Sequence, residues 1–357
     1  MTREFDAAVL GAGPVGLIAA LQLARSGRSV AIAANRLPAP DGTRRVDAVP
    51  ASFLALLVEL GINPIGIGAD RLHRTRASAW LSAAPQVSKG ASTAHVERPA
   101  LDAALLQAAT QAGCAIRSDF SLDARKIGGR GWTAKRLIDA TGRCAVTASR
   151  RIHAPKPWVA RIFQAPIDMH DRGFAIAQLP QGYVYRLGAA STLAFGVVGR
   201  RDVVAGSFPD IAQHLRAHSP WMLEDLPPFV KLRSTGACAA SVQWSEGKGL
   251  RIGDAALARD ALSSQGIATG ASEALQACAM DGEDDLASII ARQREQRQAH
   301  LRSLLGVLEN GRFSDTPAWR EYIDFVGSLL EPDNVEWTAA VRGNRIHRVD
   351  LKHQNMH

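Results

Sequence analysis

The sequence has few cysteines and no long hydrophobic run. Its four cysteines are far apart and form no CxxC pair: Cys114, Cys144, Cys238 and Cys278. This spacing indicates neither a zinc site nor a disulfide framework, so free thiols in a reducing compartment are expected. No charge-free apolar run could span a bilayer, and the first residues lack the pattern of a signal peptide. We therefore expect a cytoplasmic protein with no metal and no membrane partner.

Aromatic residues are also scarce, at 6%, and they are not interleaved with the arginines. The net charge of +8 could attract nucleic acid, an anionic cofactor or an acidic partner. Because the basic residues are spread along the whole chain, a nucleic-acid groove is not expected. A length of 357 residues with 46% hydrophobic residues is typical of a globular protein of about two domains.

A glycine-rich turn follows the first apolar run, residues 5–10. Gly11, Gly13 and Gly16 have the G-x-G-x-x-G spacing, with Pro14 between the last two. In this motif the first glycine permits a tight turn, the second lets a pyrophosphate approach the backbone, and the third allows close packing of helix on strand. The free N–H groups at the start of the helix then meet the phosphates.

The residues around the turn support this interpretation. Apolar residues recur at helical spacing over 17–26, and residues 29–34 form a second buried run. A strand, a glycine turn, a helix and a second strand in this order predict a dinucleotide-binding βαβ unit.

An acidic residue is missing at the end of the second predicted strand, where it would normally bind the adenosine ribose. The sequence there is Ala33, Ala34, Asn35 and Arg36. Asn35 could hydrogen-bond the ribose, and Arg36 could stack on adenine or meet a phosphate. The alternative is that Arg36 is simply solvated. A contact from Asn35 or from Arg36 would bind the adenosine half of the cofactor less firmly than a carboxylate does.

Three further blocks follow in the chain. The first is an arginine before an amphipathic helix, the second is a strand that ends in an acid and a glycine turn, and the third is a Gly-Asp turn before a helix of small residues. They are Glu97-Arg98-Pro-Ala-Leu101, then Asp139-Ala-Thr-Gly-Arg143, then Gly253-Asp254 with Ser263-Ser-Gln265-Gly266-Ile267.

With the glycine turn, these blocks resemble the flavoprotein hydroxylases of the p-hydroxybenzoate hydroxylase type, which include the tryptophan halogenases. The resemblance implies FAD as the cofactor. It implies that Asp254 binds the ribityl or ribose hydroxyls and that Arg98 lies near the ribityl chain or the diphosphate. It also implies that Gln265, Gly266 and Ile267 direct N–H groups at the flavin's pyrimidine edge, where the helix dipole stabilises the anionic reduced flavin.

A narrower resemblance rests on three other segments: Arg45 to Pro50, Tyr183 to Gly188 and Arg312 to Arg320. They are similar to the flavoproteins that mature tryptophylquinone enzymes, the modifying partners of lysine ε-oxidase, glycine oxidase and quinohemoprotein amine dehydrogenase. This resemblance adds Arg45 to the cofactor-binding residues. It implies hydroxylation of a tryptophan side chain in a protein or peptide precursor, which would be the partner. Ala261 departs from the pattern, because a proline commonly stands there.

The implied chemistry is reduction of FAD by NADH or NADPH, followed by transfer of oxygen to an electron-rich ring. The protein must exclude water, position the ring and supply a proton. His73, Tyr185 and Arg186 are the candidates for these catalytic roles. His73 could equally be an exposed strand histidine and Tyr185 a core residue. No residue discriminates NADH from NADPH.

Several rival functions stay open. A halogenase would need a WxWxIP signature and a reactive lysine, but Lys89 lies in a Ser/Gly segment and none of the tryptophans forms the signature: Trp80, Trp132, Trp158, Trp221, Trp244, Trp319 and Trp337. A small-molecule aromatic hydroxylase is an alternative, and a prenyl-chain reductase of the same superfamily is a weaker one. A non-catalytic flavin-binding maturation scaffold is the alternative from another class.

These patterns predict an α/β fold, α+β overall. A discontinuous Rossmann-like FAD domain is expected from residues 1–65, 92–150 and 245–283, because its blocks must meet around one ligand. Residues 66–91 and 151–244 should form an inserted antiparallel substrate domain. Residues 284–357 should form a helical C-terminal region.

Overall fold

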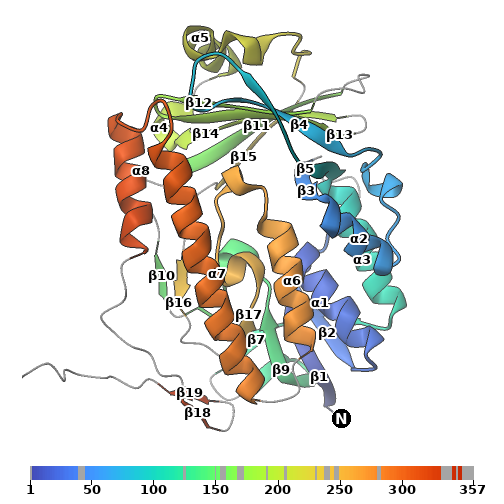
Figure 1. Ribbon diagram of the computed structural model, residues 1–357. Coiled ribbons are helices and arrows are strands. Elements are labelled where there is room, and N and C mark those ends of the chain that lie inside the picture. The colour runs from blue at the N-terminus through green and yellow to red at the C-terminus, as the bar shows by residue number, and fades with distance from the viewer. Residues whose placement is uncertain are drawn as a thin grey trace, which may run out of the picture.

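Short apolar runs that end in glycine turns form the first of two large β-sheets in the computed structural model (Figure 1). The structure describes residues 2–38, 45–123, 126–148, 150–152, 158–166, 173–189, 192–204, 207–229, 231–236, 242–244, 249–279, 283–330, 340–342 and 345–347.

The first sheet has the strand order β6-β2-β1-β9-β8-β7, and β17 pairs with β9 beside this path. Its strands are β1 (Arg3–Leu10), β2 (Val30–Ala33), β6 (Ala115–Arg117), β7 (Ser121–Asp123), β8 (Lys126–Gly129), β9 (Trp132–Asp139) and β17 (Leu250–Arg251). β2 and β9 both pair in parallel with β1, and β17 pairs in parallel with β9. The carboxyl ends of these strands therefore meet at one edge of the sheet.

Three helices of small and aliphatic residues pack on this sheet: α1 (Pro14–Arg25), α3 (Arg98–Gln111) and α6 (Gly266–Cys278). α1 lies between the other two and contacts both. Leu17 and Ile18 of α1, Leu101 of α3 and Ala274 of α6 are fully buried in one hydrophobic core. Burial of such side chains is the main source of stability for this unit.

The second sheet is mostly antiparallel and has the order β15-β11-β14-β13-β12-β4-β5-β3. Its strands are β3 (Val46–Pro50), β4 (His73–Ala79), β5 (Gln86–Glu97), β11 (Trp158–Pro166), β12 (Phe174–Leu179), β13 (Gly182–Ala189), β14 (Thr192–Arg200) and β15 (Lys231–Gly236). Successive side chains of a strand point to opposite faces, so each strand contributes to two cores. We call the face that carries Tyr183 and Leu187 the inner face and the face that carries Val184 and Phe195 the outer face.

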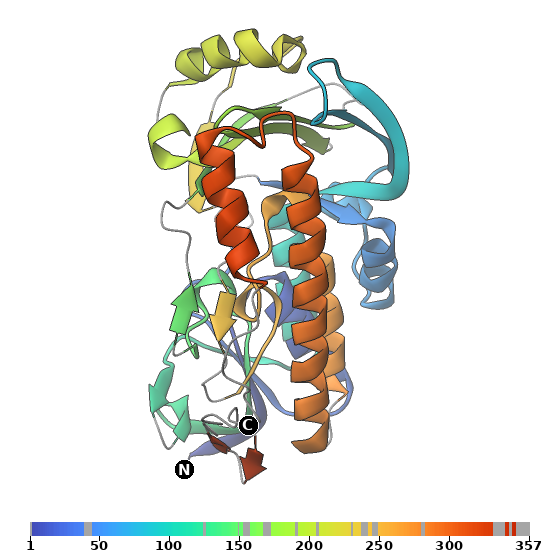
Figure 2. The same ribbon diagram turned by 60° about the vertical axis from the view of Figure 1, so that its left-hand side comes forward.

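Helices cover both faces of the second sheet. α5 (Phe208–His218) packs on the outer face through Ile211 and Leu215, and the short α4 (Arg201–Val204) follows β14. The long α7 (Glu283–Glu309) and α8 (Pro317–Ser328) pack on the inner face (Figures 1 and 2). In Figure 2, α7 runs alongside both sheets, which joins the two halves of the molecule.

The remaining elements are short. They are α2 (Ala51–Glu59), the 3-10 turns η1 (Ile65–Ile67), η2 (Gly142–Cys144), η3 (Pro220–Leu223), η4 (Gly253–Ala255) and η5 (Ala261–Ser263), and the strand pairs β10 (Arg150–Ile152) with β16 (Val242–Trp244) and β18 (Ala340–Arg342) with β19 (Arg345–His347). Within the described part of the chain, no helix combines the length and the hydropathy needed to cross a membrane.

The predicted fold class is confirmed: a Rossmann-like sheet, an antiparallel sheet and C-terminal helices are all present. The two sheets do not divide the chain at the predicted domain limits. β3 lies within the segment 1–65 but pairs with β5, and β5 itself runs across the predicted limit at residue 91. Both strands therefore belong to the second sheet, because they continue its hydrogen-bonded edge. The domain limits stay a proposal.

Candidate cofactor and active site

The turn after β1 requires glycine at two of its three motif positions. Gly11 has φ +98°, and a Cβ there would lie 2.6 Å from the carbonyl oxygen of Ala140. A Cβ on Gly16 would overlap the carbonyl oxygen of Gly11. The helix can therefore approach the strand only with glycine at both positions. Pro14 begins α1, where its lack of an N–H costs nothing.

Gly13 is the open position of the turn, and it is also the N-cap residue of α1. A Cβ built there would have Nη2 of Arg98 as its nearest neighbour, at 3.7 Å. No side chain caps the first turn of α1, so its N–H groups are available to an anion. The turn and the Arg98 guanidinium thus form a cradle that combines backbone N–H groups with a cation, as an anion such as a diphosphate requires.

Asp47 holds Arg98 in this place. The Arg98 Nη1 atom donates to Oδ2 of Asp47 at 3.2 Å, and Nε donates to Oδ1 of Asp102 at 2.7 Å. Arg45, the residue directly before β3, also contacts the cluster: its Nη2 atom lies 3.0 Å from Oδ2 of Asp47. Burial alone would raise the pKa of Asp47, but Arg45 and Arg98 lower it, so the carboxylate stays charged. Sequence reasoning named both arginines and missed Asp47, although its i+2 spacing from Arg45 was a usable signal.

The Gly-Asp turn lies after β17. Gly253 has φ +59°, and its N–H donates to Oε2 of Glu273 at 2.7 Å. The Asp254 side chain is 34% exposed, with one oxygen 3.7 Å from Nε of Arg143. A Cβ on Gly266 would lie 3.6 Å from Oδ1 of Asp254. The carboxylate is therefore next to the N-terminus of α6, where Gln265 is exposed and Ile267 packs against the core.

Asp139 organises the turn after β9. Its carboxylate is fully buried and accepts the N–H and the hydroxyl of Thr141, at 2.9 and 2.6 Å. It also accepts the N–H and the hydroxyl of Thr147, at 2.9 and 2.7 Å. The Asp139 carboxylate thus accepts four hydrogen bonds within the protein, and these bonds fix the backbone of the turn beside the glycine turn.

The three turns meet because of the strand order. Leu10 at the end of β1 lies opposite Asp139 of β9, and Asp139 lies opposite Arg251 of β17. In open α/β sheets, ligands bind beyond the carboxyl ends of the strands. This edge faces the second sheet, since the N-terminus of β1 lies at the far end of the molecule (Figure 1). Asn35 and Arg36 follow β2 at the same edge, and both are exposed.

The predicted catalytic residues Tyr185 and Arg186 lie on opposite faces of the second sheet. Tyr185 packs on the inner core with its ring over Gly196 of β14. Burial raises the pKa of its phenol, so the group is a weaker acid than an ordinary tyrosine. Arg186 points to the outer side, where Nη1 donates to the carbonyl oxygen of Glu224 at 3.2 Å. The structure therefore does not bring these two side chains together.

His73 stacks on a second histidine that sequence reasoning missed. The rings of His73 and His95 are parallel within 15°, with centroids 4.1 Å apart. His95 is 2% exposed, and its Nδ1 lies 2.6 Å from the carbonyl oxygen of Gly188. Because a carbonyl only accepts, Nδ1 carries the proton. Burial and the neighbouring His73 lower the pKa of His95 to about 4, so the ring is neutral. The pairing follows from the β4–β5 hairpin, which no local pattern reveals.

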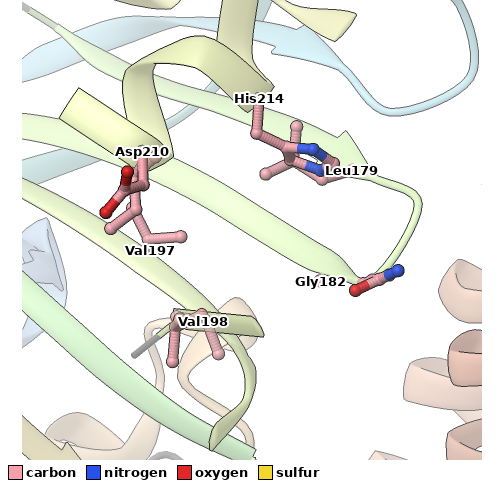
Figure 3. A pocket seen from close by; sticks show the side chains of 9 residues that line it. Leu179, Gly182, Val197, Val198, Asp210 and His214 are labelled. Atoms are coloured by element: carbon pink, nitrogen blue, oxygen red, sulfur yellow. The ribbon is translucent and has the colours of Figure 1, made fainter. Parts of the chain in front are cut away.

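A cavity of about 410 Å³ lies elsewhere, between α5 and the β12–β13 turn (Figure 3). It is lined by Leu179, Gln181, Gly182, Val197, Val198, Val204, Asp210, Ile211 and His214. Since α5 covers the outer face, the cavity is separate from the cofactor edge. The Asp210 carboxylate faces Ser207 at the start of α5, in a capping box. Among the described residues, no group of histidines, cysteines and carboxylates is arranged to hold a metal ion.

Comparison with known proteins identifies the fold. No family model matches the sequence, and no curated protein matches it. The myxobacterial chondrochloren halogenase CndH, a variant of the FAD-dependent halogenases, superposes with a TM-score of 0.72 at 18% identity, over 89% of this chain and 86% of that one.

Two other solved structures are similar. The peptidyl tryptophan dihydroxylase QhpG, essential for tryptophylquinone cofactor biogenesis, has a TM-score of 0.71 at 21% identity, over 97% of this chain and 86% of that one. The flavin-dependent brominase Bmp2 has a TM-score of 0.70 at 16% identity, over 91% and 93%. The chain therefore has the fold of flavin-dependent halogenases and of this dihydroxylase, which confirms at the level of the fold the resemblance seen in the sequence.

Proposed function

We propose that this chain is an FAD-dependent monooxygenase that hydroxylates an aromatic ring, namely a tryptophan side chain of a protein precursor during tryptophylquinone biogenesis. The observation that carries the proposal is the cradle at Gly13. Arg98 lies beside this open glycine, and Asp254 lies at the N-terminus of α6 on the same edge of the sheet. The proposed reductant is NADH or NADPH, and the proposed location is the cytoplasm.

The residues of this edge fit the parts of FAD. Gly11, Gly13, Pro14 and Gly16 would take the diphosphate with Arg98, which Arg45 supports through Asp47. A site of this kind combines backbone N–H groups with a charge-assisted donor. Bound FAD would supply the redox and oxygen-transfer chemistry.

The other half of the cofactor would lie along the Gly-Asp turn. Asp254 would accept the ribityl hydroxyls, and Gln265, Gly266 and Ile267 would present N–H groups to the pyrimidine edge. Asn35 and Arg36 would contact the adenosine. A Cβ built on Gly266 would lie 3.6 Å from Oδ1 of Asp254, and this proximity supports the proposal that both act on one ligand.

The inner face of the second sheet would form the substrate side. Tyr185 is the best-placed of the predicted catalytic residues, because it lies on the inner face and its protonated phenol can donate a hydrogen bond. His73 is a second candidate, held against His95. Arg186 faces away from this side, so a direct catalytic role would require another binding mode. The apolar residues of the inner core would exclude water from the reaction.

The choice of a peptidyl tryptophan rests on the likeness to the dihydroxylase QhpG, which spans 97% of this chain. The likeness to CndH and Bmp2 supports halogenation as a second candidate. Against it, the sequence lacks the WxWxIP signature, and Lys89 is exposed on β5.

The test uses the purified protein with FAD, NADH or NADPH, and oxygen. A yellow protein whose flavin is bleached by the reductant, with peroxide formation that falls when a tryptophan-bearing precursor is added, supports the proposal. The mass of the precursor then distinguishes addition of oxygen from addition of a halogen. Flavin that binds but is never reduced would favour a maturation scaffold.

A further inference from the structure

A buried aspartate lies in the loop that joins the Gly-Asp turn to α6. Asp260 is 4% exposed, and its carboxylate accepts three hydrogen bonds. The donors are the hydroxyl of Tyr322 at 2.5 Å, the N–H of Leu262 at 2.7 Å and the hydroxyl of Tyr183 at 3.3 Å. One donor belongs to the loop itself, one to β13 and one to α8. Three distant segments of the chain therefore meet at a single carboxylate.

The loop is short, and the proposed cofactor contacts Asp254 and Gly266 lie at its two ends. Its middle is fixed on both sides. Arg259 pairs with Glu273 of α6 at 3.2 Å, and Asp260 caps the η5 turn that leads to α6. The hydroxyl of Ser263 adds a bond to the carbonyl oxygen of Asp260 at 2.9 Å. Asp260 therefore lies in a loop that is attached to α6 at its middle and leads into the N-terminus of that helix.

Tyr322 is held rigidly enough to fix this loop. It is 3% exposed, and its ring stacks on Trp158 of β11 with centroids 4.5 Å apart and planes 23° apart. The neighbouring Trp319 of α8 is fully buried and donates to the carbonyl oxygen of Leu179 at 2.7 Å. These contacts direct the phenol of Tyr322 at Asp260.

Removal of the Tyr322 hydroxyl would disturb the loop, not merely the packing. Burial raises the pKa of Asp260, and the hydrogen bonds and the nearby Arg143 act against this shift. A buried acceptor that loses its shortest donor bears a desolvation cost, so the surrounding backbone would shift to find another donor.

We propose that Tyr322 is a positioning residue of the cofactor site: through Asp260, it fixes the loop 255–265 and thereby the N-terminus of α6 against the flavin. This inference rests on the proposed function, since it requires FAD at that helix end. A helix N-terminus stabilises the anionic reduced flavin more than the oxidised one. Loss of the Tyr322–Asp260 bond should therefore make the bound flavin harder to reduce.

The experiment compares Tyr322→Phe with a matched control, Phe325→Leu. Phe325 is a half-buried aromatic residue of the same helix and packs on the same core. The midpoint potential of the bound flavin and the melting temperature are measured for both variants and the wild type. In Tyr322→Phe we expect the ratio of the affinities for reduced and oxidised FAD to fall about tenfold. For a two-electron couple, this lowers the midpoint potential by about 30 mV. In Phe325→Leu, we expect the wild-type potential.

A wild-type potential in Tyr322→Phe, with only a lower melting temperature, would overturn the inference, since that is the result of a purely structural role. If Tyr322→Phe does not fold, Tyr183→Phe takes its place, because it removes the other hydroxyl donor to Asp260 without a change of charge; the same lowered potential is expected, and an unchanged one overturns the inference. A wild-type protein that binds no flavin overturns the proposed function as well. The two failures are therefore distinguishable.

Discussion

The N–H of Gly253 donates to the side chain of Glu273 at 2.7 Å, so the turn that carries Asp254 is held by the helix whose N-terminus it faces. The other oxygen of Glu273 pairs with Arg259 at 3.2 Å, and the two side chains are only 2% and 4% exposed. Burial raises the pKa of Glu273, and Arg259 and the Gly253 N–H oppose that shift. One side chain thus ties α6 to both parts of the preceding loop.

Replacement of Glu273 should be among the most destabilising single changes. Glu273→Ala leaves the Arg259 cation and the Gly253 N–H buried without their acceptor, and loss of one partner of a buried pair costs about 3–5 kcal/mol. Glu273→Gln keeps a neutral acceptor and should cost less. Urea unfolding measures both free energies. A Glu273→Ala variant within about 1 kcal/mol of the wild type would contradict this interpretation of the contact.

The glycines of the first turn should separate folding from cofactor binding. Gly13→Val should fold, because the position is open, but should retain no FAD, since the side chain occupies the place of the diphosphate. Gly16→Val should fail to fold, because its Cβ would overlap the Gly11 carbonyl. Circular dichroism and flavin absorbance of the two variants make the comparison. A yellow Gly13→Val protein would place the cofactor elsewhere.

Arg98→Ala should weaken FAD binding and also lower the free energy of unfolding, because Asp47 and Asp102 lose a cationic partner. A hydrogen bond to a charged group is worth about 1.5–3 kcal/mol, which is a loss of affinity of about tenfold or more. Arg186→Ala is the control, because this arginine lies on the outer face of the second sheet. Fluorescence titration with FAD gives both dissociation constants. Equal constants for the two variants would remove Arg98 from the site.

Tyr185 should affect product formation and not flavin reduction. If Tyr185 supplies a proton, Tyr185→Phe should lower the rate of product formation by about 10²-fold or more. The rate of flavin reduction should stay near the wild-type value, since that step does not involve the phenol. Rapid-mixing kinetics separate the two steps. Full product formation by Tyr185→Phe would leave the tyrosine a core residue.

Stability should fall in mild acid because of His95. Its pKa is lowered from 6.5 to about 4, so between these pH values His95 is protonated in the unfolded chain and neutral in the folded chain. The free energy of unfolding is therefore unaffected by His95 above pH 6.5. It falls by on the order of 3 kcal/mol as the pH falls from 6.5 towards 4. His300 has a shift of the same sign, so part of the loss is not due to His95.

The matched variant is His95→Asn, in which the amide can donate to Gly188 but cannot titrate. The free energy of unfolding of this variant should depend less steeply on pH between 6.5 and 4 than that of the wild type. Parallel curves would show that His95 does not carry the effect.

Local patterns predicted those parts of the cofactor site that depend on short-range geometry. Gly11 and Gly16 are required by the close packing of helix on strand at this turn. Asp254 follows the end of a strand that the apolar pattern of the sequence indicates. Asp47, Glu273 and Asp260 were missed, because each acts through a partner that is distant in the chain. A lone buried acid has no periodic signature. α5 was also missed, since it interrupts a region that otherwise alternates as strands.

By itself, the sequence determined the glycine turn after the first strand, the alternation of strands and helices and the class of fold, because glycine sterics and hydrophobic periodicity act over a few residues. Only the tertiary structure decided that β3 and β5 join the second sheet, that Tyr185 and Arg186 face opposite sides, and that Tyr322 reaches Asp260. These outcomes depend on which strand edges pair and which faces are covered. Such choices are made by the whole chain as it buries its apolar surface.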